Sequence, residues 1–140
     1  MYLDLKVHLV FNGNCEEAFN TYSKAFGGKI VFLFRKGDDK SIPTNEAEKN
    51  KISHIVLNAD KLSLQGEDAP AGEQVITGSS KLVLVFKEMD KLQRVFETLS
   101  DGGTVVTPLG KTFFTEAIGE VVDKFGIRWL IMMTDEAYKG

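Results

Sequence analysis

The chain contains two histidines, His8 and His54, and each lies within a short apolar run that is typical of a β-strand. In the run ISHIVLNA, alternation places His54 and Asn58 on one face and the apolar Ile55 on the other. Ile55 and Leu57 suit packing beneath a helix, so we expect His54 and Asn58 on the open face. An imidazole titrates near neutral pH and can act as an acid, a base or a hydrogen-bonding group. The alternative is a structural histidine at a strand end, and alternation does not fix the face of His8.

The segment KTFFTEAIG carries a second group of candidate side chains. Phe113 and Phe114 are adjacent, so on an extended chain one faces the core and the other offers a platform for a flat or apolar ligand. Glu116 is a candidate acid, or a carboxylate that orients a ligand. If both imidazoles face inward, His8 and His54 could form a two-histidine site with Glu116. The alternatives are that both phenylalanines pack under the loop and that Glu116 is an exposed charge.

The elements that would position these residues follow from an internal repeat. KVHLVF at 6–11 and KLVLVF at 81–86 share four of six residues at an offset of 75 positions. The same offset relates the glycine pair at 27–28 to the pair at 102–103. The chain therefore contains two copies of one structural module.

Each module is predicted to contain one amphipathic helix that ends at its glycine pair, because glycine readily adopts the left-handed conformation of a helix C-terminus. Asn14 followed by Glu17 predicts a capping box at the start of the first helix. The predicted buried stripes of the two helices are Cys15, Ala18, Phe19, Tyr22 and Phe26, and Met89, Leu92, Val95, Phe96 and Leu99.

Three strands are predicted after each glycine pair. Their ranges are 29–34, 52–59 and 62–65 in the first half, and 104–109, 118–123 and 127–133 in the second. Two βαβββ modules, at about 1–66 and about 79–140, predict a single α+β domain. With the helices on the outer face, we expect about eight strands to form one curved, mostly antiparallel sheet whose other face is a cup. The polar segment between Lys36 and Lys51 is predicted to be a solvated loop.

The segment VVDKFGIRWLIMM predicts a turn at Phe125-Gly126 that leads into the last strand. Alternation places Trp129 in the core beneath the helices, and Arg128 and Leu130 on the face of the cup. We therefore count Arg128 and Leu130 among the candidate ligand contacts.

The composition limits the partners of the chain. A net charge of −3 at pH 7 argues against nucleic acid, because phosphate binding needs a basic surface. No apolar run approaches the roughly 20 residues that span a bilayer. The one cysteine, Cys15, fits a cytoplasmic protein without an internal disulfide. In the first turn of a helix its thiol could have a lowered pKa, or it could be a small buried residue.

Three motifs give the chain a resemblance to a known superfamily: FNGNCEEA at 11–18, His54 followed by Asp68, and DKFGIRW at 123–129. With the paired modules, they resemble the vicinal oxygen chelate superfamily of glyoxalase I, ring-cleaving dioxygenases and bleomycin-resistance proteins, and more closely its PhnB-like members. The resemblance implies a small-molecule ligand in a cup and a homodimer. Names given to such proteins include a methyltransferase, but both glycine pairs end helices, so no nucleotide-binding loop is expected.

Metal-bearing members of this superfamily use His, Gln or Glu side chains from four inward-facing strand positions. By the resemblance, the last position falls at Leu130 and the one that opens the second module falls near Lys81, and neither is a suitable ligand. The other two positions fall at Val7, with Lys6 or His8 one residue away in register, and at Gln65 or Glu67. The sequence therefore disfavours a divalent metal, and we expect no cofactor.

The leading hypothesis is a PhnB-like protein that binds a small molecule in the cup without the usual metal. The catalytic candidates are His54 and Glu116, and the candidate ligand contacts are His8, Asn58, Phe113, Phe114, Arg128 and Leu130. One alternative is a lyase or isomerase that acts on an oxygen-rich metabolite through His54, with His8 or Glu116. Another is a non-catalytic, drug-sequestering protein of the bleomycin-resistance type. Whether any reaction is catalysed stays open at this point.

Overall fold

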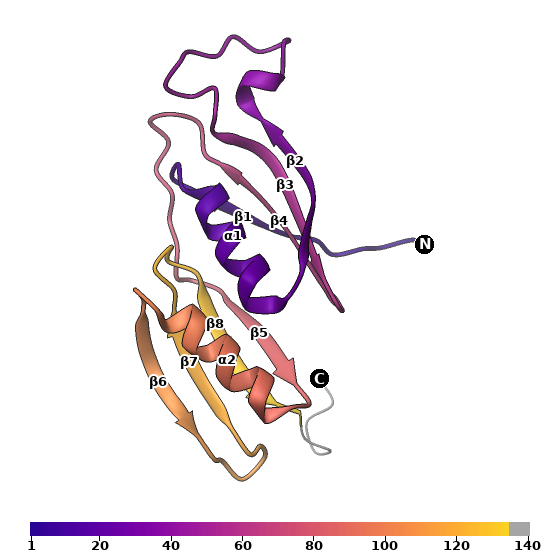
Figure 1. Ribbon diagram of the computed structural model, residues 1–140, viewed down its shortest axis with the longest axis vertical. Helices are drawn as coiled ribbons and strands as arrows, with labels where there is room; N and C mark the ends of the chain where they lie inside the picture. The colour runs from indigo at the N-terminus through magenta and orange to yellow at the C-terminus, as the bar shows by residue number, and fades with distance from the viewer. Residues whose placement is uncertain (135–140) are drawn as a thin grey trace. The chain divides into compact units, whose positions relative to one another are not determined.

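The computed structural model describes residues 1–134, which form two compact units, the first from Met1 to Val75 and the second beginning at Ile76 (Figure 1). The first unit contains β1 (Val7–Phe11), α1 (Cys15–Phe26), β2 (Lys29–Arg35), the short 3-10 helix η1 (Lys36–Asp38), β3 (Ile52–Ala59) and β4 (Leu62–Asp68). The second contains β5 (Lys81–Phe86), α2 (Met89–Ser100), β6 (Thr104–Gly110), β7 (Ile118–Val122) and β8 (Arg128–Met133). Each unit thus has the predicted βαβββ order.

The first unit is a four-stranded mixed sheet in the order β1-β4-β3-β2. β1 runs parallel to β4, whereas the β3–β4 and β2–β3 pairs are antiparallel. The whole predicted stripe of α1 is buried and packs on one face of this sheet (Figure 1). From β3 the stripe meets Ile55 and Leu57, both fully buried. Their alternation partners His54 and Asn58 therefore lie on the other face, as predicted.

The second unit repeats this plan, with strand order β5-β8-β7-β6 and with β5 parallel to β8. Four of the five residues predicted for the stripe of α2 are buried: Leu92, Val95, Phe96 and Leu99. Trp129 and Ile131 of β8 are fully buried in the core of this unit, as the alternation of the last strand predicted.

The α+β fold of two βαβββ modules is confirmed. The described residues form two four-stranded sheets, and the joining of these sheets into one cup within a single domain stays a prediction. No helix among residues 1–134 is long and apolar enough to cross a membrane.

A buried carboxylate, Asp123, organises the hairpin between β7 and β8. It accepts hydrogen bonds from the backbone N–H groups of Phe125 and Ile127, at 2.9 and 3.0 Å, and from the indole Nε1–H of Trp129 at 2.8 Å. Gly126 completes the predicted turn with a φ of 93°, a conformation that other residues rarely adopt. The D-x-F-G-x-x-W motif is therefore a structural device of this hairpin.

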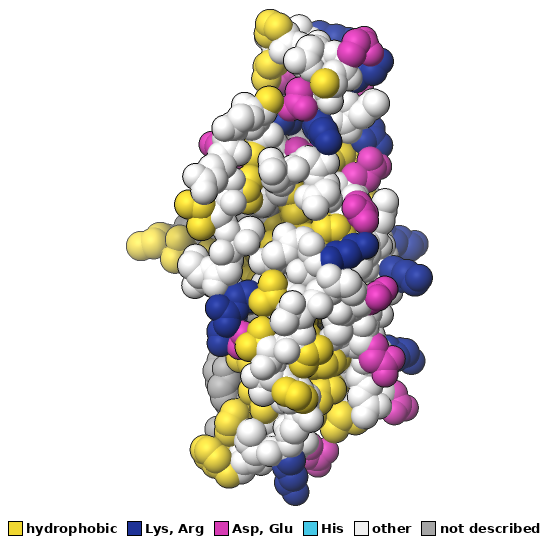
Figure 2. All heavy atoms as spheres, turned by 90° about the vertical axis from the view of Figure 1, so that its left-hand side faces the viewer, with side chains coloured by type: hydrophobic (Ala, Val, Ile, Leu, Met, Phe, Trp, Pro, Cys, Tyr) yellow, Lys and Arg dark blue, Asp and Glu magenta, His cyan; other side chains and the backbone are white. Residues whose placement is uncertain are grey.

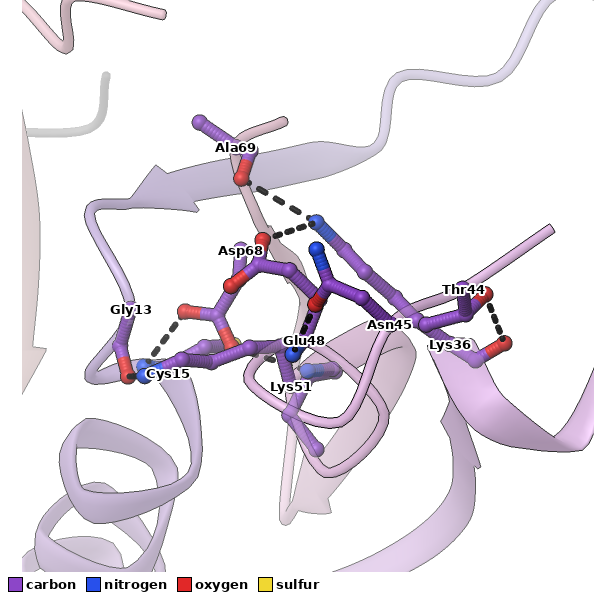
Figure 3. A network of polar contacts seen from close by, with 10 residues as sticks. Gly13, Cys15, Lys36, Thr44, Asn45, Glu48, Lys51, Asp68 and Ala69 are labelled. Carbon is purple, nitrogen blue, oxygen red and sulfur yellow. Dashed lines mark hydrogen bonds and ion pairs between the residues drawn. The ribbon is translucent and has the colours of Figure 1, made fainter. Parts of the chain in front are cut away.

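The capping box predicted at the start of α1 is wrong in one respect, because the Asn14 side chain makes no capping hydrogen bond. The role is taken by Asp68, at the end of β4. Its buried carboxylate accepts hydrogen bonds from the backbone N–H groups of Cys15, at 3.0 Å, and of Ile52, at 2.8 Å (Figure 3). Asp68 thereby joins the start of the helix to the start of β3.

The polar segment between β2 and β3 is attached to the rest of the first unit by its ends. The Lys36 ammonium donates to the carbonyl of Ala69 at 3.1 Å, and the Lys51 ammonium donates to the carbonyl of Gly13 at 3.0 Å (Figure 3). The predicted solvated loop is thus held down by two lysines, while its central residues are mostly exposed.

Candidate functional site

The face of the first sheet that lies opposite α1, here called the first open face, brings together polar and aromatic side chains from all four strands. It is formed by His8 and Val10 of β1, Ser63, Gln65 and Glu67 of β4, His54, Val56 and Asn58 of β3, and Phe32 and Phe34 of β2. His8 pairs with Gln65 across the β1–β4 ladder, and Phe34 pairs with His54 across the β2–β3 ladder. The register of the sheet therefore brings His8 and His54 to one surface.

Four rings form a continuous row across the first open face. The rings of His8 and His54 are stacked, with centroids 5.5 Å apart and an interplanar angle of 23°. Phe32 lies 5.8 Å from His54 on its other side, and Phe34 lies 6.4 Å from Phe32. The row extends from edge strand β1 to edge strand β2, across the whole sheet.

Glu67 holds one end of this row. Its Oε1 lies 3.1 Å from Nε2 of His8. An ionised carboxylate can only accept a hydrogen bond, so His8 donates from Nε2 and its ring orientation is fixed. The Glu67–His8 pair therefore presents the second ring nitrogen, Nδ1, in a defined position.

The first open face is accessible. The side chains of His8 and Glu67 are 33% and 39% exposed, and Phe32 is 49% exposed. Asn58 is exposed as well, and its side-chain oxygen accepts a hydrogen bond from Ser63 at 2.9 Å. Neither imidazole is visible on the side of the molecule drawn in Figure 2, where hydrophobic and charged side chains reach the surface. The surface thus offers flat rings for stacking and polar groups for orientation.

Among residues 1–134, no group of three or more His, Cys, Asp or Glu side chains is placed to hold a metal ion. Of the positions considered as metal ligands, His8, Gln65 and Glu67 lie on the first open face. Lys81 and Leu130 lie on the sheet of the second unit.

The remaining predicted site residues belong to the second unit. Phe113 is 99% exposed in the loop before β7, and its ring packs edge-on against half-buried Phe114, with centroids 5.2 Å apart. The alternative that both rings pack under the loop is therefore wrong. Glu116 is exposed in the same loop, and its proposed site with the two imidazoles stays a prediction.

Sequence reasoning missed a charged cluster in the second unit. Glu120 of β7 is buried, with its Oε1 2.6 Å from the Lys81 ammonium and its Oε2 bonded to the Arg128 guanidinium. The hydrogen bonds from Arg128 and Lys81 hold the pKa of the Glu120 carboxyl below its ordinary value. The sequence signal for this cluster was a lone carboxylate, Glu120, that shares one face of an apolar strand with Ile118 and Val122. The pattern of that strand identifies Glu120, but its partners Lys81 and Arg128 lie on other strands.

The single thiol is not part of a reactive site. Cys15 is fully buried on the stripe of α1, so the reading as a small buried residue is confirmed. Burial raises the pKa of the Cys15 thiol, and the nearby carboxylate of Asp68 raises it further. The lowered pKa considered for a helix N-terminus is therefore wrong for this cysteine.

A solved structure of another protein shares this architecture. A glyoxylase/bleomycin resistance protein/dioxygenase domain from Frankia sp. EAN1pec has the same fold, with a TM-score of 0.70, 16% sequence identity and coverage of 99% of this chain and 96% of that domain. The two proteins thus share the predicted α+β fold.

The family follows from a longer match in sequence. The family model for 3-demethylubiquinone-9 3-methyltransferase matches residues 4–132, and the chain belongs to this family, as its PhnB-like motifs predicted.

Three relatives extend over nearly the whole chain. Protein YjdN of Escherichia coli K12 is 26% identical over 92% of this chain and 94% of its own length. Protein PA1353 of Pseudomonas aeruginosa has a TM-score of 0.85 at 30% identity, over 94% of this chain and 98% of its own. A putative 3-demethylubiquinone-9 3-methyltransferase, PhnB protein, from Bacillus cereus has a TM-score of 0.79 at 23% identity, over 94% of this chain and 100% of its own.

Proposed function

We propose that this protein binds a small, flat, oxygen-bearing organic molecule on the first open face, without the metal site of the superfamily. The observation that carries the proposal is the row of four rings, Phe34–Phe32–His54–His8, that ends at Glu67 on an accessible surface. Aromatic rings contribute stacking area to a flat ligand at small entropic cost. Imidazole and amide groups donate to its oxygens, which fixes the orientation of the ligand.

The family description names a methyl transfer, yet the position of the glycines favours binding without a nucleotide cofactor. Gly27 caps the C-terminus of α1 with a φ of 70°, and Gly102 follows α2 with a φ of 73°. The glycine-rich loops that hold nucleotide cofactors typically lead from a strand into a helix N-terminus. Both glycine pairs of this chain lie at the opposite ends of their helices.

A second candidate function, a lyase or isomerase, is favoured by one specific contact. Glu67 orients the His8 ring as a carboxylate orients an imidazole base in many enzymes. In this version His8 and His54 transfer protons on a bound oxygen-rich metabolite, and Glu67 orients the His8 ring. Within residues 1–134, no contact specifically favours the drug-sequestering alternative.

Ligand-induced thermal stabilisation tests the proposal with a panel of aromatic acids, hydroxy-ketones and quinones. A ligand at about one hundred times its Kd adds about 2.7 kcal/mol, which raises the Tm of a protein of this size by several degrees. We expect one chemical class to stabilise the wild type and the control variant Gln93→Ala, at an exposed position of α2, equally. His54→Ala and Phe32→Ala should lose most of the shift. A panel without any stabilising compound, or an unchanged shift in His54→Ala, would contradict the proposal.

The same assay tests the metal and the reaction. Tight stabilisation by Zn²⁺, Ni²⁺ or Mn²⁺ that disappears in Glu67→Gln would overturn the metal-free part of the proposal. Turnover of a stabilising ligand, lost in His54→Ala, would establish the enzyme.

We also propose a cytoplasmic homodimer, which rests on the single cysteine and on the superfamily resemblance. A monomeric mass in light scattering at micromolar concentration would contradict the dimer.

A further inference from the structure

The second unit has its own open face, opposite α2, and the parallel pair β5–β8 arranges it as three rungs. Lys81 pairs with Arg128, Val83 with Leu130, and Val85 with Met132. Successive rungs on one face of a strand lie about 7 Å apart. Along this pair of strands a cationic rung is therefore followed by two apolar rungs, and the three rungs together span about 14 Å.

The cationic rung is held in place by a carboxylate on the same face of the neighbouring strand β7. Glu120 is only 6% exposed, and each of its oxygens binds one cation, Lys81 or Arg128. Arg128 also donates from Nη1 to the carbonyl of Gly78 at 3.0 Å. Two cations around one carboxylate leave one net positive charge at this end of the face. The Lys81 ammonium is 45% exposed and has three N–H donors, of which the contact with Glu120 uses one.

The β5 side chains of the apolar rungs are accessible beside that charge, whereas Met132 of the second rung is buried. Val83 and Val85 of β5 are 46% and 51% exposed, and Leu130 of β8 is half-buried. Adjacent exposed aliphatic side chains next to a fixed cation match a ligand with a hydrocarbon chain and an anionic head. An anion gains from the net charge, whereas a cation is repelled by it and a neutral chain gains only the apolar contacts.

We propose that this second open face binds free aliphatic carboxylates of medium length. The carboxylate accepts hydrogen bonds from the Lys81 ammonium beside Arg128, and the chain lies along Val83, Leu130 and Val85. A strip of about 14 Å suits a chain of about ten carbons. The site lies entirely within the second unit, and it goes beyond the function proposed for the first open face.

Isothermal titration calorimetry with sodium decanoate, below its micelle concentration, tests this site on the full chain. We expect decanoate to bind the wild type and to bind Lys81→Met about tenfold more weakly, since the variant keeps the aliphatic stem and loses the charge. Val83→Ser should weaken binding several-fold. The matched control Lys87→Met removes an exposed lysine of the same unit and should bind as the wild type does. His54→Ala should also leave decanoate binding unchanged.

Two further ligands distinguish the contribution of the carboxylate head to binding from that of the hydrocarbon chain. Butyrate should bind far more weakly than decanoate because it does not reach the second apolar rung. Decyltrimethylammonium should bind about tenfold more weakly because its head is repelled. Should Lys81→Met lose its fold by circular dichroism, Val83→Ser and the comparison of head groups on the wild type decide the matter.

The proposal is overturned by any of four results. These are no decanoate binding to the wild type, equal binding to folded Lys81→Met, equal binding of the cationic surfactant, or a signal that disappears in His54→Ala and persists in Lys81→Met. The last result would assign the carboxylate to the first open face.

Discussion

The two units share one plan, but their open faces carry different chemistry. The ladder registers match positions between the units: His8 with Val83, His54 with Ile118, Gln65 with Leu130, Glu67 with Met132, and Val56 with Glu120. The imidazoles and carboxylate of the first face are aliphatic or thioether side chains in the second. The buried carboxylate of the second face is a valine in the first. The faces that pack on the helices are apolar in both units, so the repeated pattern specifies the fold and the open faces are free to differ.

The buried anchors of the two units also differ. Asp68 accepts hydrogen bonds from the starts of α1 and β3, whereas Asp123 accepts them from the β7–β8 hairpin and the indole of Trp129. In both units a buried carboxylate thus satisfies backbone N–H groups, but at different positions of the βαβββ module. Removing such an acceptor leaves buried donors without a partner, which costs more than the hydrogen bond itself contributes.

The largest expected effect is on these anchors. Asp123→Ala should lower the free energy of unfolding by about 4 kcal/mol, because it leaves two backbone donors and one indole donor unsatisfied. Asp68→Ala should lower it by about 3 kcal/mol, since two backbone donors are involved. Urea unfolding followed by circular dichroism measures both. Asp101→Ala, at an exposed position after α2, is the control and should change stability by about 0.5 kcal/mol or less. If Asp123→Ala is as stable as Asp101→Ala, the hydrogen bonds of Asp123 do not stabilise the hairpin as proposed.

The next effect concerns Glu120, which has no charged counterpart in the first unit. Its pKa is lowered in the folded state by hydrogen bonds from Arg128 and Lys81. Its contribution is therefore fully present above the unfolded carboxyl pKa of about 4.3, and is lost as the pH falls through the folded pKa. We expect Glu120→Gln to be about 1.5 kcal/mol less stable than the wild type at pH 7, with a smaller gap at pH 3.

Denaturant curves at several pH values test this expectation. Glu97→Gln changes an exposed carboxylate of α2 and should show a small gap that is similar at all pH values. If the difference in unfolding free energy between Glu120→Gln and the wild type is the same at pH 7 and pH 3, a titrating ion pair is ruled out.

The smallest expected effect concerns an ion pair between the end of β2 and α1, beside the long β2–β3 connection. Arg35 binds Glu16 of α1 through two nitrogens, at 2.9 and 2.8 Å, next to the long polar segment. Both side chains are about one-third exposed or more, so solvent weakens the pair. Glu16→Gln should lower stability by about 0.5 kcal/mol, with less effect in 0.5 M salt. Glu46→Gln, which removes an 88% exposed partner of Lys49, should have no measurable effect. A loss above about 2 kcal/mol for Glu16→Gln would indicate a buried pair.

The elements of the fold were predictable because their signals are local. Helical spacing identified the stripes of α1 and α2, and alternation identified the face of His54 and the burial of Trp129. Most strand bounds agreed within one residue, although β4 extends to Asp68, three residues beyond its predicted end. That extension carries Glu67 and Asp68, the two residues that partner His8 and α1.

The candidate site was predictable only in part, because its contacts depend on register between distant strands. His8, His54 and Phe32 come from three strands, and no local pattern reveals that their rings form a row. Asn14 was the obvious cap by local sequence, but the carboxylate that takes its place lies 53 residues from Cys15 along the chain. Likewise, the sequence marks Glu120 as a lone carboxylate in an apolar strand, but it does not reveal that Lys81 and Arg128 surround it.

The burial of Trp129 and Cys15 gives each unit its own built-in reporter. The chain has one tryptophan and one cysteine, both fully buried, the first in the second unit and the second in the first. Indole fluorescence therefore monitors the opening of one unit, and the rate of thiol labelling monitors the opening of the other. Without any engineered label, the two signals can show whether the halves of this repeat unfold as one or independently.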